Sequence, residues 1–321
     1  MTTQPWLSII TPVYNGADYL SFALDSILAQ QEDNIEHIVI DGTSTDSTLS
    51  ILHRYQDKLP LKILTRESKE NWVTKTNYAL SIATGKYVCF LHHDDLWFEG
   101  RLSAMKPLTE QFPNAVFFLH PSNFIDKSGK SLGLWSCPLP TAPKIIQPKF
   151  MLERLLVQNF ISIVAPIFKR ETALAVGGLD ESLWYTADWD FWLKIVACGD
   201  ALYHPKPLTG YRIHQHSQTI LRSSYIKDFQ EQLEKVANRH LALWEAPEHL
   251  KRKVHRLSQV STDVNVTLAN FVHGGNPNIV KPIIALLLLG PFGWNQFFRD
   301  SRIWQRASAR LKARLASSPK P

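Results

Sequence analysis

Acidic residues directly follow two apolar segments of the chain. Asp41 comes after residues 37–40, and the pair Asp94 and Asp95 comes after residues 86–91. Adjacent carboxylates behind an apolar segment are costly unless something neutralises them, and a divalent cation that bridges phosphates does so with hard oxygen ligands. The pair therefore indicates a divalent metal site, with a helix N-cap followed by an acidic first turn as the structural alternative. For Asp41 the alternative is an ordinary polar turn.

Two further polar motifs lie in the second half of the chain. Asp188 stands near the start of the aromatic-rich segment ADWDFWL, and the motif YRIH follows at residues 211–214. Four polar motifs in this order leave little room for chance. The tryptophans near Asp188 could form a stacking platform for a sugar, but aromatic residues at helical spacing are more often core residues. We therefore expect Trp192 to be packed, and both interpretations stay open for Trp184.

The pattern of apolar residues predicts the strands and helices that must position these motifs. Residues 7–12 and 37–40 are β-branched apolar runs, which are typical of buried parallel strands. Residues 18–31 between them carry apolar side chains at helical spacing. The alternation continues with a helix at 47–54, a strand at 61–65, a helix at 74–83 and a strand at 86–91. This order implies an α/β fold, a doubly wound sheet whose ligand crevice lies at the carboxyl ends of the strands.

The later part of the chain has a different pattern. Residues 114–150 are rich in turn formers and predict a lid or an acceptor-side segment. Beyond them the spacing of apolar residues predicts helices at 151–157, 188–197 and 226–244. We expect a catalytic domain over residues 1–225 and a helical C-terminal extension over residues 226–321.

With these motifs in order, the chain resembles the family-2 glycosyltransferases, which have the GT-A fold, over residues 5–220. The matching motifs are SIITPVYN at 8–15, IDGTSTDST at 40–48, the residues Asn77, Ala83, Thr84 and Gly85, HHDDLW at 92–97, ADWDFWL at 187–193 and YRIH at 211–214. The resemblance implies a GT-A-type, Rossmann-like mixed sheet with a helical C-terminal appendage. It also implies an inverting glycosyltransferase, but the motifs do not specify the sugar.

The resemblance implies a role for each matching position. Asp188 would be the general base, and Asp94 and His214 would bind Mn²⁺ or Mg²⁺. Asp95 would orient the site or the sugar, and Arg212 could face the diphosphate. The residues implied on the donor side are Pro12, Tyr14, Asn15, Asp41, Ser44 and Asn77. In inverting chemistry the base deprotonates the acceptor hydroxyl as it attacks the anomeric carbon, and the metal offsets charge on the departing diphosphate.

Several positions depart from the family pattern. His92 stands where many relatives have the first acid of the metal motif, so either it binds metal or supports the site by hydrogen bonding, or the metal site is weaker. Asn71 replaces a usual glycine and tolerates a left-handed backbone. Lys75 either approaches the donor diphosphate or, as we prefer, faces solvent from a helix. His93 and His216 are as readily surface groups as metal ligands.

Composition limits the class of protein. A chain of 321 residues with 45% hydrophobic residues can bury a full core. Three scattered cysteines are too few for a disulfide framework, and residues 1–6 carry no secretory signal, so we expect a cytoplasmic protein. The net charge of +6 suits an anionic partner such as a nucleoside diphosphate or an acidic lipid surface. Nucleic acid is disfavoured because positive charge concentrates near the C-terminus and no nucleic-acid motif is present.

The C-terminal segment combines an apolar run with regularly spaced arginines. Residues 282–290 are strongly apolar but far fewer than the ~20 residues that span a bilayer. After Gly293, arginines recur every three or four residues opposite aromatic and leucine positions, at Arg299, Arg302, Arg306, Arg310 and Arg314. This pattern predicts a basic amphipathic helix. The helix either lies peripherally on an anionic, cytoplasmic membrane face or docks on the catalytic domain.

Taken together, these features predict sugar transfer from a nucleotide-sugar, UDP- or dTDP-linked, to a saccharide or lipid-linked saccharide in cell-surface polysaccharide or glycolipid assembly. Two other classes stay open. A non-catalytic nucleotide-sugar-binding protein of the same fold is suggested by His92 and the basic tail, but Asp188 argues against it. A nucleotidyltransferase is disfavoured because residues 12–16 contain no glycine-rich, basic phosphate loop.

Overall fold

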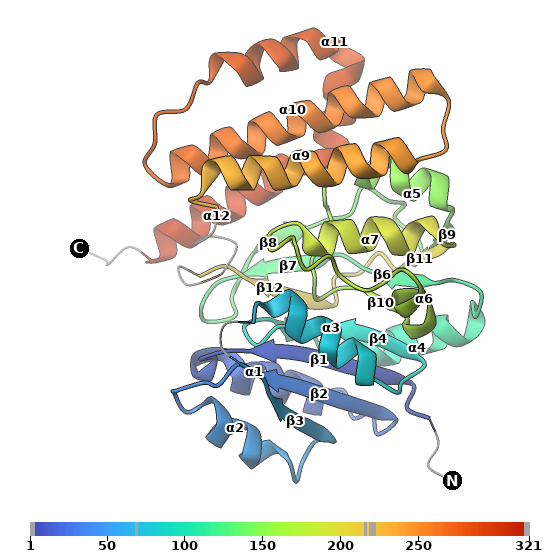
Figure 1. Ribbon diagram of the computed structural model, residues 1–321, viewed down its shortest axis with the longest axis vertical. Helices are drawn as coiled ribbons and strands as arrows, with labels where there is room; N and C mark the ends of the chain where they lie inside the picture. The colour runs from blue at the N-terminus through green and yellow to red at the C-terminus, as the bar shows by residue number, and fades with distance from the viewer. Residues whose placement is uncertain (1–3, 68–69, 215–216, 218–222, 318–321) are drawn as a thin grey trace.

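A mixed sheet of eight strands forms the centre of the molecule (Figure 1). The structure, a computed structural model, describes residues 4–67, 70–214, 217 and 223–317, with side chains through residue 313. In spatial order the strands are β3 (Leu61–Thr65), β2 (Ile35–Asp41), β1 (Leu7–Val13), β4 (Tyr87–Phe90), β10 (Ile167–Lys169), β6 (Phe117–Leu119), β11 (Ala201–Tyr203) and β9 (Lys144–Ile146). The first four run parallel, whereas β10 runs antiparallel to both β4 and β6. The predicted doubly wound, GT-A-type mixed sheet is confirmed.

Successive side chains of the parallel strands enter different cores, as the two-residue period of a strand requires. Ile10 and Ile38 enter one core, and Ile9 and Val39 enter the other. The first core is closed by α3 (Trp72–Ile82), α5 (Pro148–Leu155), α6 (Arg170–Ala175) and α7 (Ala187–Ala197), and the second by α1 (Ala17–Leu28), α2 (Thr48–Tyr55) and α4 (Arg101–Gln111). Because helices cover both faces, the strands are continuous apolar runs in the sequence.

Helix α3 begins at Trp72 rather than at residue 74. Asn71 explains the earlier start, because its side-chain oxygen accepts a hydrogen bond from the backbone N–H of Thr74 at 3.0 Å. The backbone of Asn71 is extended, with φ of −73° and ψ of 171°. This residue is therefore the N-cap of α3 and does not adopt the left-handed conformation that we considered for it.

A second sheet has four strands, in the order β5 (Leu96–Trp97), β12 (Thr209–Arg212), β7 (Ser122–Ile125) and β8 (Ser131–Trp135). Residues 114–150, predicted as a lid or an acceptor-side segment, supply strands to both sheets. The side chains of Phe117 and Phe124 in this segment are buried. The segment is therefore part of the framework, and turn formers such as Pro121 and Gly129 lie in the connections between its strands.

Four helices follow the sheets, α9 (Ile226–Leu243), α10 (Glu248–Val272), α11 (Val280–Ser301) and α12 (Ile303–Ser317). Figure 1 shows α10 and α11 at the opposite end of the molecule from α2 and β3. Val236 and Val254 enter the same core as Trp192 of α7. The start of α9 coincides with the expected boundary at residues 225 and 226, but α9 and α10 share the core of the catalytic part.

The prediction of one continuous basic helix after Gly293 is wrong. Helix α11 is kinked at Gly290, where φ is 65° and ψ is 176°, and Pro291 follows. The helix ends before Arg302, whose left-handed backbone (φ 50°) separates α11 from α12. In the part of the chain that the structure describes, no helix has the length and apolarity needed to cross a membrane.

Helix α12 docks on the second sheet. Ala309 and Ala313 are buried in a small core with Phe124 and Ile213. The Lys312 ammonium donates a hydrogen bond to a backbone carbonyl of β8 at 3.0 Å. Of the two alternatives for the basic segment, docking on the catalytic domain is therefore the one that the structure shows for α12.

Candidate active site

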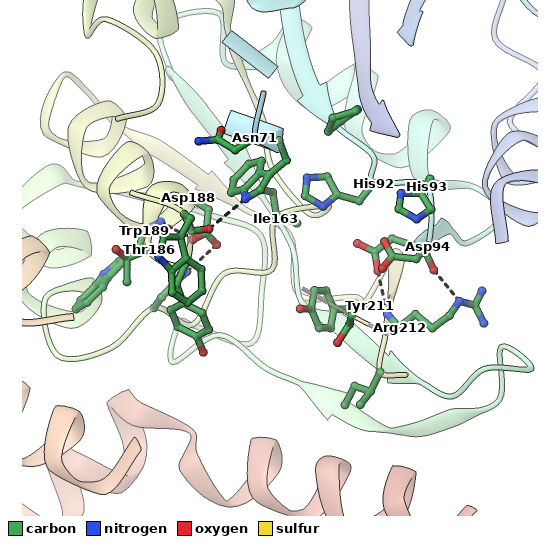
Figure 2. Close-up of a pocket in the computed structure, with 18 of the residues that line it drawn as sticks. Asn71, His92, His93, Asp94, Ile163, Thr186, Asp188, Trp189, Tyr211 and Arg212 are labelled. Atoms are coloured by element: carbon green, nitrogen blue, oxygen red, sulfur yellow. Dashed lines mark hydrogen bonds between the residues drawn. The ribbon is translucent and has the colours of Figure 1, made fainter. Parts of the chain in front are cut away.

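A cavity of about 340 Å³ opens at the carboxyl ends of β1 and β4. Pro12 and Tyr14, at the end of β1, contribute to its wall. Figure 2 shows Asp188 on one side of the cavity and Asp94 on the other, with Tyr211 between them. The crevice that we predicted at the strand ends is present, and it brings together three of the four polar motifs.

Asp94 and His214 form one polar corner of the site. Nε2 of His214 lies 3.0 Å from Oδ2 of Asp94. Burial alone would raise the pKa of Asp94, but the hydrogen bond with His214 and the neighbouring imidazoles of His92 and His93 hold it well below its ordinary value. Asp94 is therefore a carboxylate at neutral pH, next to an imidazole that comes from a distant part of the chain.

Asp95 is buried and links the HHDD segment to the YRIH segment. Its Oδ1 accepts a hydrogen bond from the backbone N–H of Arg212 at 2.9 Å. Burial and the negative charge of Asp94 raise the pKa of Asp95 well above its ordinary value. The bond sets the position of β12 relative to the HHDD segment, and so places His214 beside Asp94.

The residues of this corner fit a divalent cation only if the donor supplies further ligands. Within the described residues, no group of three or more His, Cys, Asp or Glu side chains is arranged to hold a metal ion. Asp94 and His214 offer one carboxylate and one imidazole, and phosphate oxygens could complete the coordination. This mixed oxygen and nitrogen set fits Mn²⁺ better than Mg²⁺, which prefers oxygen ligands.

His92 is a further nitrogen donor beside this corner. Its ring packs edge-on against Trp72 with ring centroids 5.3 Å apart. Its Nε2 is buried and has no hydrogen-bond partner within the described part of the chain. Burial lowers the pKa of His92 to about 4, so the imidazole is neutral at physiological pH. A neutral imidazole fits either role that we considered for His92, as a ligand or as a hydrogen-bonding support.

Asp188 lies in the first turn of α7, and both of its oxygens are held in place. Oδ1 accepts a hydrogen bond from the backbone N–H of Trp189 at 2.8 Å, and Oδ2 accepts one from Nδ2 of Asn159 at 3.0 Å. Burial raises the pKa of Asp188 to about 6 in spite of these bonds. The carboxylate is therefore ionised at pH 7 and more basic than an ordinary aspartate, as a general base requires.

The side chain of Arg212 bonds to backbone carbonyls of two neighbouring segments. Its Nε donates to the backbone carbonyl of Asp94 at 2.6 Å, and its Nη1 donates to the carbonyls of Asp126 and Lys127 at 2.7 and 3.0 Å. The guanidinium also lies over the ring of Tyr19, 4.8 Å from its centroid. Figure 2 shows the side chain extending away from Asp188. Arg212 therefore supports the corner formed by Asp94 and His214, and because it also lines the cavity, its contact with a diphosphate stays a prediction.

The two loops expected to bind the nucleoside are held together by their own hydrogen bonds. The carboxylate of Asp41 accepts bonds from the hydroxyl and the backbone N–H of Ser44, at 2.6 and 3.0 Å. The backbone N–H of Asn15 donates to the same hydroxyl at 2.9 Å, and its side-chain oxygen accepts a bond from Thr45 at 2.8 Å. Tyr14 is 50% exposed and contributes an aromatic ring from these loops to the cavity wall.

Lys75 is buried, so the preferred expectation that it faces solvent is wrong. Its exposed fraction is 4%, and it lines the cavity. A methyl group at Gly42 would lie 2.5 Å from the Lys75 ammonium, so the glycine leaves the room that this side chain occupies. Burial lowers the pKa of Lys75, against the raising effect of Glu70 and Asp41. The other alternative, a lysine on the donor side, is consistent with this position.

The side chain of Asn77 bonds to a neighbouring loop and is not among the residues that line the cavity. Its Nδ2 donates to the carbonyl of Leu179 at 2.9 Å and to the carboxylate of Glu181 at 3.0 Å, and its Oδ1 accepts a bond from the Leu179 N–H at 2.9 Å. These bonds fasten α3 to the turn before α7. The contacts of Asn77 therefore indicate a positioning residue, in contrast to the donor contact that we expected.

Among the residues of the cavity wall that sequence reasoning missed, Asn159, Arg306 and Arg310 carry polar groups that matter for the site. Asn159, which positions Asp188, lies in a segment without any motif. Arg306 and Arg310 also line the cavity, although their spacing on α12 had suggested a membrane-facing role. His216, considered as a possible ligand, lies outside the described residues.

The comparison with protein families decides the class of this site. The sequence model of glycosyl transferase family 2 matches residues 8–171, about half of the chain. The chain belongs to glycosyl transferase family 2. The resemblance drawn from the ordered motifs is thereby confirmed.

Relatives of this glycosyltransferase extend the similarity. An uncharacterized glycosyltransferase of Rickettsia typhi is 27% identical over 248 residues, which cover 71% of this chain and 70% of that protein. The UDP-Glc:alpha-D-GlcNAc-diphosphoundecaprenol beta-1,3-glucosyltransferase of Escherichia coli is 33% identical over 132 residues, 41% of this chain and 51% of that protein. The crystal structure of S. aureus TarS in complex with UDP-GlcNAc has a TM-score of 0.65 at 17% identity, over 98% of this chain and 93% of that one, and shows a shared fold.

Part of the site of this glycosyltransferase lies beyond the family match. Asp94 lies within residues 8–171, whereas Asp188, His214 and the two arginines of α12 follow them. The cavity therefore joins a segment that the family model matches with a C-terminal helix that lies outside the match.

Proposed function

We propose that this glycosyltransferase moves a sugar from a nucleotide-sugar to an acceptor hydroxyl with inversion at the anomeric carbon. The observation that carries the proposal is the placement of Asp188, with its pKa of about 6, across one cavity from Asp94. An in-line displacement needs a base on one side of the anomeric carbon and charge stabilisation of the leaving group on the other. The two sides of the cavity offer these two functions.

Asp188 acts on the acceptor in the proposed reaction. Its carboxylate takes the proton of the acceptor hydroxyl as that oxygen attacks the anomeric carbon, and the bond to the diphosphate breaks on the far side. The bonds from Asn159 and the Trp189 N–H hold the carboxylate in one orientation. A divalent ion held by Asp94 and His214 would stabilise the charge on the diphosphate. Lys75 adds a positive charge to the donor side, and no covalent intermediate is needed.

A pyrimidine nucleotide, UDP or dTDP, is the proposed carrier of the sugar. The nucleoside would bind where the loops after β1 and β2 meet, with its base near the exposed ring of Tyr14. An aromatic ring at a cavity wall offers a stacking face for a base. The name of the E. coli relative specifies UDP-glucose, and TarS was crystallised with UDP-GlcNAc, so a uridine nucleotide is the first candidate.

The proposed acceptor is a saccharide, free or linked to a lipid, in polysaccharide or glycolipid assembly. Support comes from the E. coli relative, whose name specifies an undecaprenyl-linked acceptor. A lipid-linked acceptor would require this enzyme to work at a membrane surface, and we propose a peripheral position on the cytoplasmic face.

A screen of nucleotide-sugars tests the proposed function. We expect the full chain to release the free nucleoside diphosphate from a UDP- or dTDP-sugar, and Mn²⁺ to stimulate the release, because the corner of Asp94 and His214 needs the ion to hold a diphosphate. Chromatography of nucleotides after incubation with and without Mn²⁺ measures this. Release of a nucleoside monophosphate and a sugar phosphate would instead show cleavage within the diphosphate. Binding without turnover of any donor would support the non-catalytic alternative.

The first half of α11 is the surface that we propose for membrane contact. Ile283, Ile284, Leu287 and Leu288 are 49%, 51%, 62% and 73% exposed, and Phe292 is 94% exposed. The first four recur at a spacing of four residues, so they form one stripe along the helix. Phe292 lies just beyond the kink at Gly290. Exposed apolar stripes and nearby exposed aromatic residues suit the boundary between lipid headgroups and acyl chains.

The arginines contribute less to this contact than their spacing suggested. Arg299 is paired with Asp300, and Arg302 donates to the carbonyl of Cys137 at 3.2 Å. Arg306 and Arg310 turn toward the cavity. We therefore propose attachment that rests mainly on the apolar stripe and depends only weakly on salt.

Replacing two leucines of this stripe with aspartate should release the protein from vesicles. Burying one leucine is worth about 1.5–3 kcal/mol, so Leu287→Asp with Leu288→Asp should reduce flotation with phosphatidylglycerol-containing vesicles at least about tenfold. Leu243→Asp, at a position 72% exposed on α9, is the matched control and should float normally. Unchanged flotation of the double variant would refute the membrane surface. A dimer that the substitutions dissociate, seen by light scattering, would assign the stripe to a second copy.

A further inference from the structure

Two arginines of α12 line the cavity from one face of the helix. Arg306 and Arg310 are spaced by four residues, so they are neighbours on the helix surface. Packing holds the helix in this position, because Ala309 and Ala313 are buried against the second sheet and Lys312 bonds to β8. The two guanidinium groups therefore belong to the wall of the site.

In the part of the chain that the structure describes, these two cations have no ion-pair partner. Among the described residues, no carboxylate forms an ion pair with Arg306 or Arg310, and Nη1 of Arg306 is buried without a hydrogen-bond partner. Burial and the charge of Arg310 lower the pKa of Arg306 to about 10, so it stays protonated at physiological pH. Like charges one turn apart repel, and a buried unsatisfied donor is unfavourable. A bound anion would reduce the repulsion between the two guanidinium groups and would accept a hydrogen bond from the buried donor.

The arginines lie on the acceptor side of the cavity. Tyr185, Tyr211 and Asp188 line the same cavity as Arg306 and are close enough to raise its pKa. Asp188 and Asp94 stand on different sides of the cavity in Figure 2, and the donor diphosphate is assigned to Asp94. An anion bound beside Arg306 would therefore be a second one, distinct from the diphosphate of the donor.

We propose that Arg306 and Arg310 bind a phosphate or diphosphate group carried by the acceptor sugar. Guanidinium groups bind phosphate oxygens through paired, charge-assisted hydrogen bonds. A phosphate attached to the accepting sugar lies one sugar ring away from the reacting hydroxyl, which suits cations beside the base. The inference rests on the proposed function, because it takes Asp188 to mark the position of that hydroxyl.

Calorimetry with farnesyl diphosphate tests the inference on the full chain. EDTA is included so that the corner of Asp94 and His214 cannot hold a diphosphate through a metal ion. We expect farnesyl diphosphate to bind, and the variant with both Arg306→Gln and Arg310→Gln to bind at least tenfold more weakly. The double lysine variant keeps the charges without the guanidinium fork and should retain part of the affinity. Arg256→Gln, an exposed arginine on α10, is the control for the change in charge.

The remaining arms of the experiment separate the possible sources of binding. Inorganic pyrophosphate should compete with farnesyl diphosphate, whereas farnesol should bind weakly and without dependence on the arginines. Equal affinity of the glutamine variant and the unaltered chain would overturn the inference, provided that their melting temperatures agree. Farnesol binding as tightly as farnesyl diphosphate would also overturn it. Mn²⁺-dependent binding of UDP and release of nucleoside diphosphate, measured on the unaltered chain, test the proposed function independently of this result.

Discussion

Replacing Asp188 with asparagine is expected to lower the rate of sugar transfer by roughly 10²–10⁴-fold, the usual contribution of a general base. The amide cannot take the proton of the acceptor hydroxyl, although it has the same shape as the carboxylate. Binding of the nucleoside diphosphate should persist, because the donor side of the cavity is left intact. Initial rates of transfer and calorimetry with the nucleotide measure the two effects. Transfer near the unaltered rate would show that another group is the base.

A matched control is available on the same helix. Asp190→Asn makes the same change in α7, but Asp190 is bonded to Arg239 and His240 instead of lining the cavity. We expect this variant to lose stability, seen as a lower melting temperature, while the folded protein keeps its turnover. A loss of turnover in Asp190→Asn as large as in Asp188→Asn would attribute both effects to disruption of the helix.

The dependence of the rate on pH distinguishes the role of Asp188 further. A base must be ionised, and the pKa of Asp188 is raised to about 6, so the rate should fall as the pH drops through about 6. Asn159→Leu removes a hydrogen bond that favours the carboxylate. The pKa of Asp188 should then rise, and the acid limb of the profile should move to higher pH. A profile that stays flat to pH 5 would contradict a base with this pKa.

Asp94→Ala is expected to abolish the metal-dependent part of donor binding. Loss of a residue that only supports a metal ligand typically weakens metal binding about 10–100-fold, so loss of a direct ligand should weaken it at least as much. Calorimetry with UDP in the presence and absence of Mn²⁺ measures the difference. In the variant, Mn²⁺ should no longer improve the affinity for UDP.

Two further variants test whether the effect of Mn²⁺ depends specifically on Asp94 and His214. Asp33→Ala removes an exposed carboxylate and should leave the effect of Mn²⁺ unchanged. His214→Gln keeps a polar group near Asp94 but removes the imidazole, and should weaken the effect of Mn²⁺ without disturbing Asp188. If Asp94→Ala still responded to Mn²⁺ as the unaltered chain does, the HHDD segment would be a helix cap and the metal would bind elsewhere or not at all.

The order of strands and helices in the first hundred residues could be predicted from the sequence, because their apolar side chains repeat with the local period of each element. β1 and β2 are buried strands that contain short apolar runs, and in β2 the run ends at Asp41. The carboxyl ends of parallel strands meet at one edge of the sheet, so the locations of Asp94 and the β1 loop followed from the pattern alone. The family resemblance identified Asp188 as the candidate base. Its place in the first turn of α7 follows from the local helical pattern.

Only the tertiary structure decided what the charged and amide side chains contact. Arg212 and Asn77 are polar residues in family motifs, yet their partners are backbone carbonyls and a distant turn that no local pattern specifies. Lys75 lies on a helix with other polar residues. Its side chain is nevertheless buried, because Gly42 in a different loop has no side chain and leaves room for the ammonium group.

The C-terminal arginines show the same division between local and long-range information. Their spacing predicts a helix with one basic face, and the sequence by itself determined that much correctly for α12. Which surface that face meets depends on the left-handed break at Arg302 and on small residues that dock α12 on the second sheet. Helical periodicity is a property of neighbouring residues, whereas the partner of a helix face is set by packing between segments far apart in the chain, so a basic stripe that suggested a membrane became part of a cavity wall.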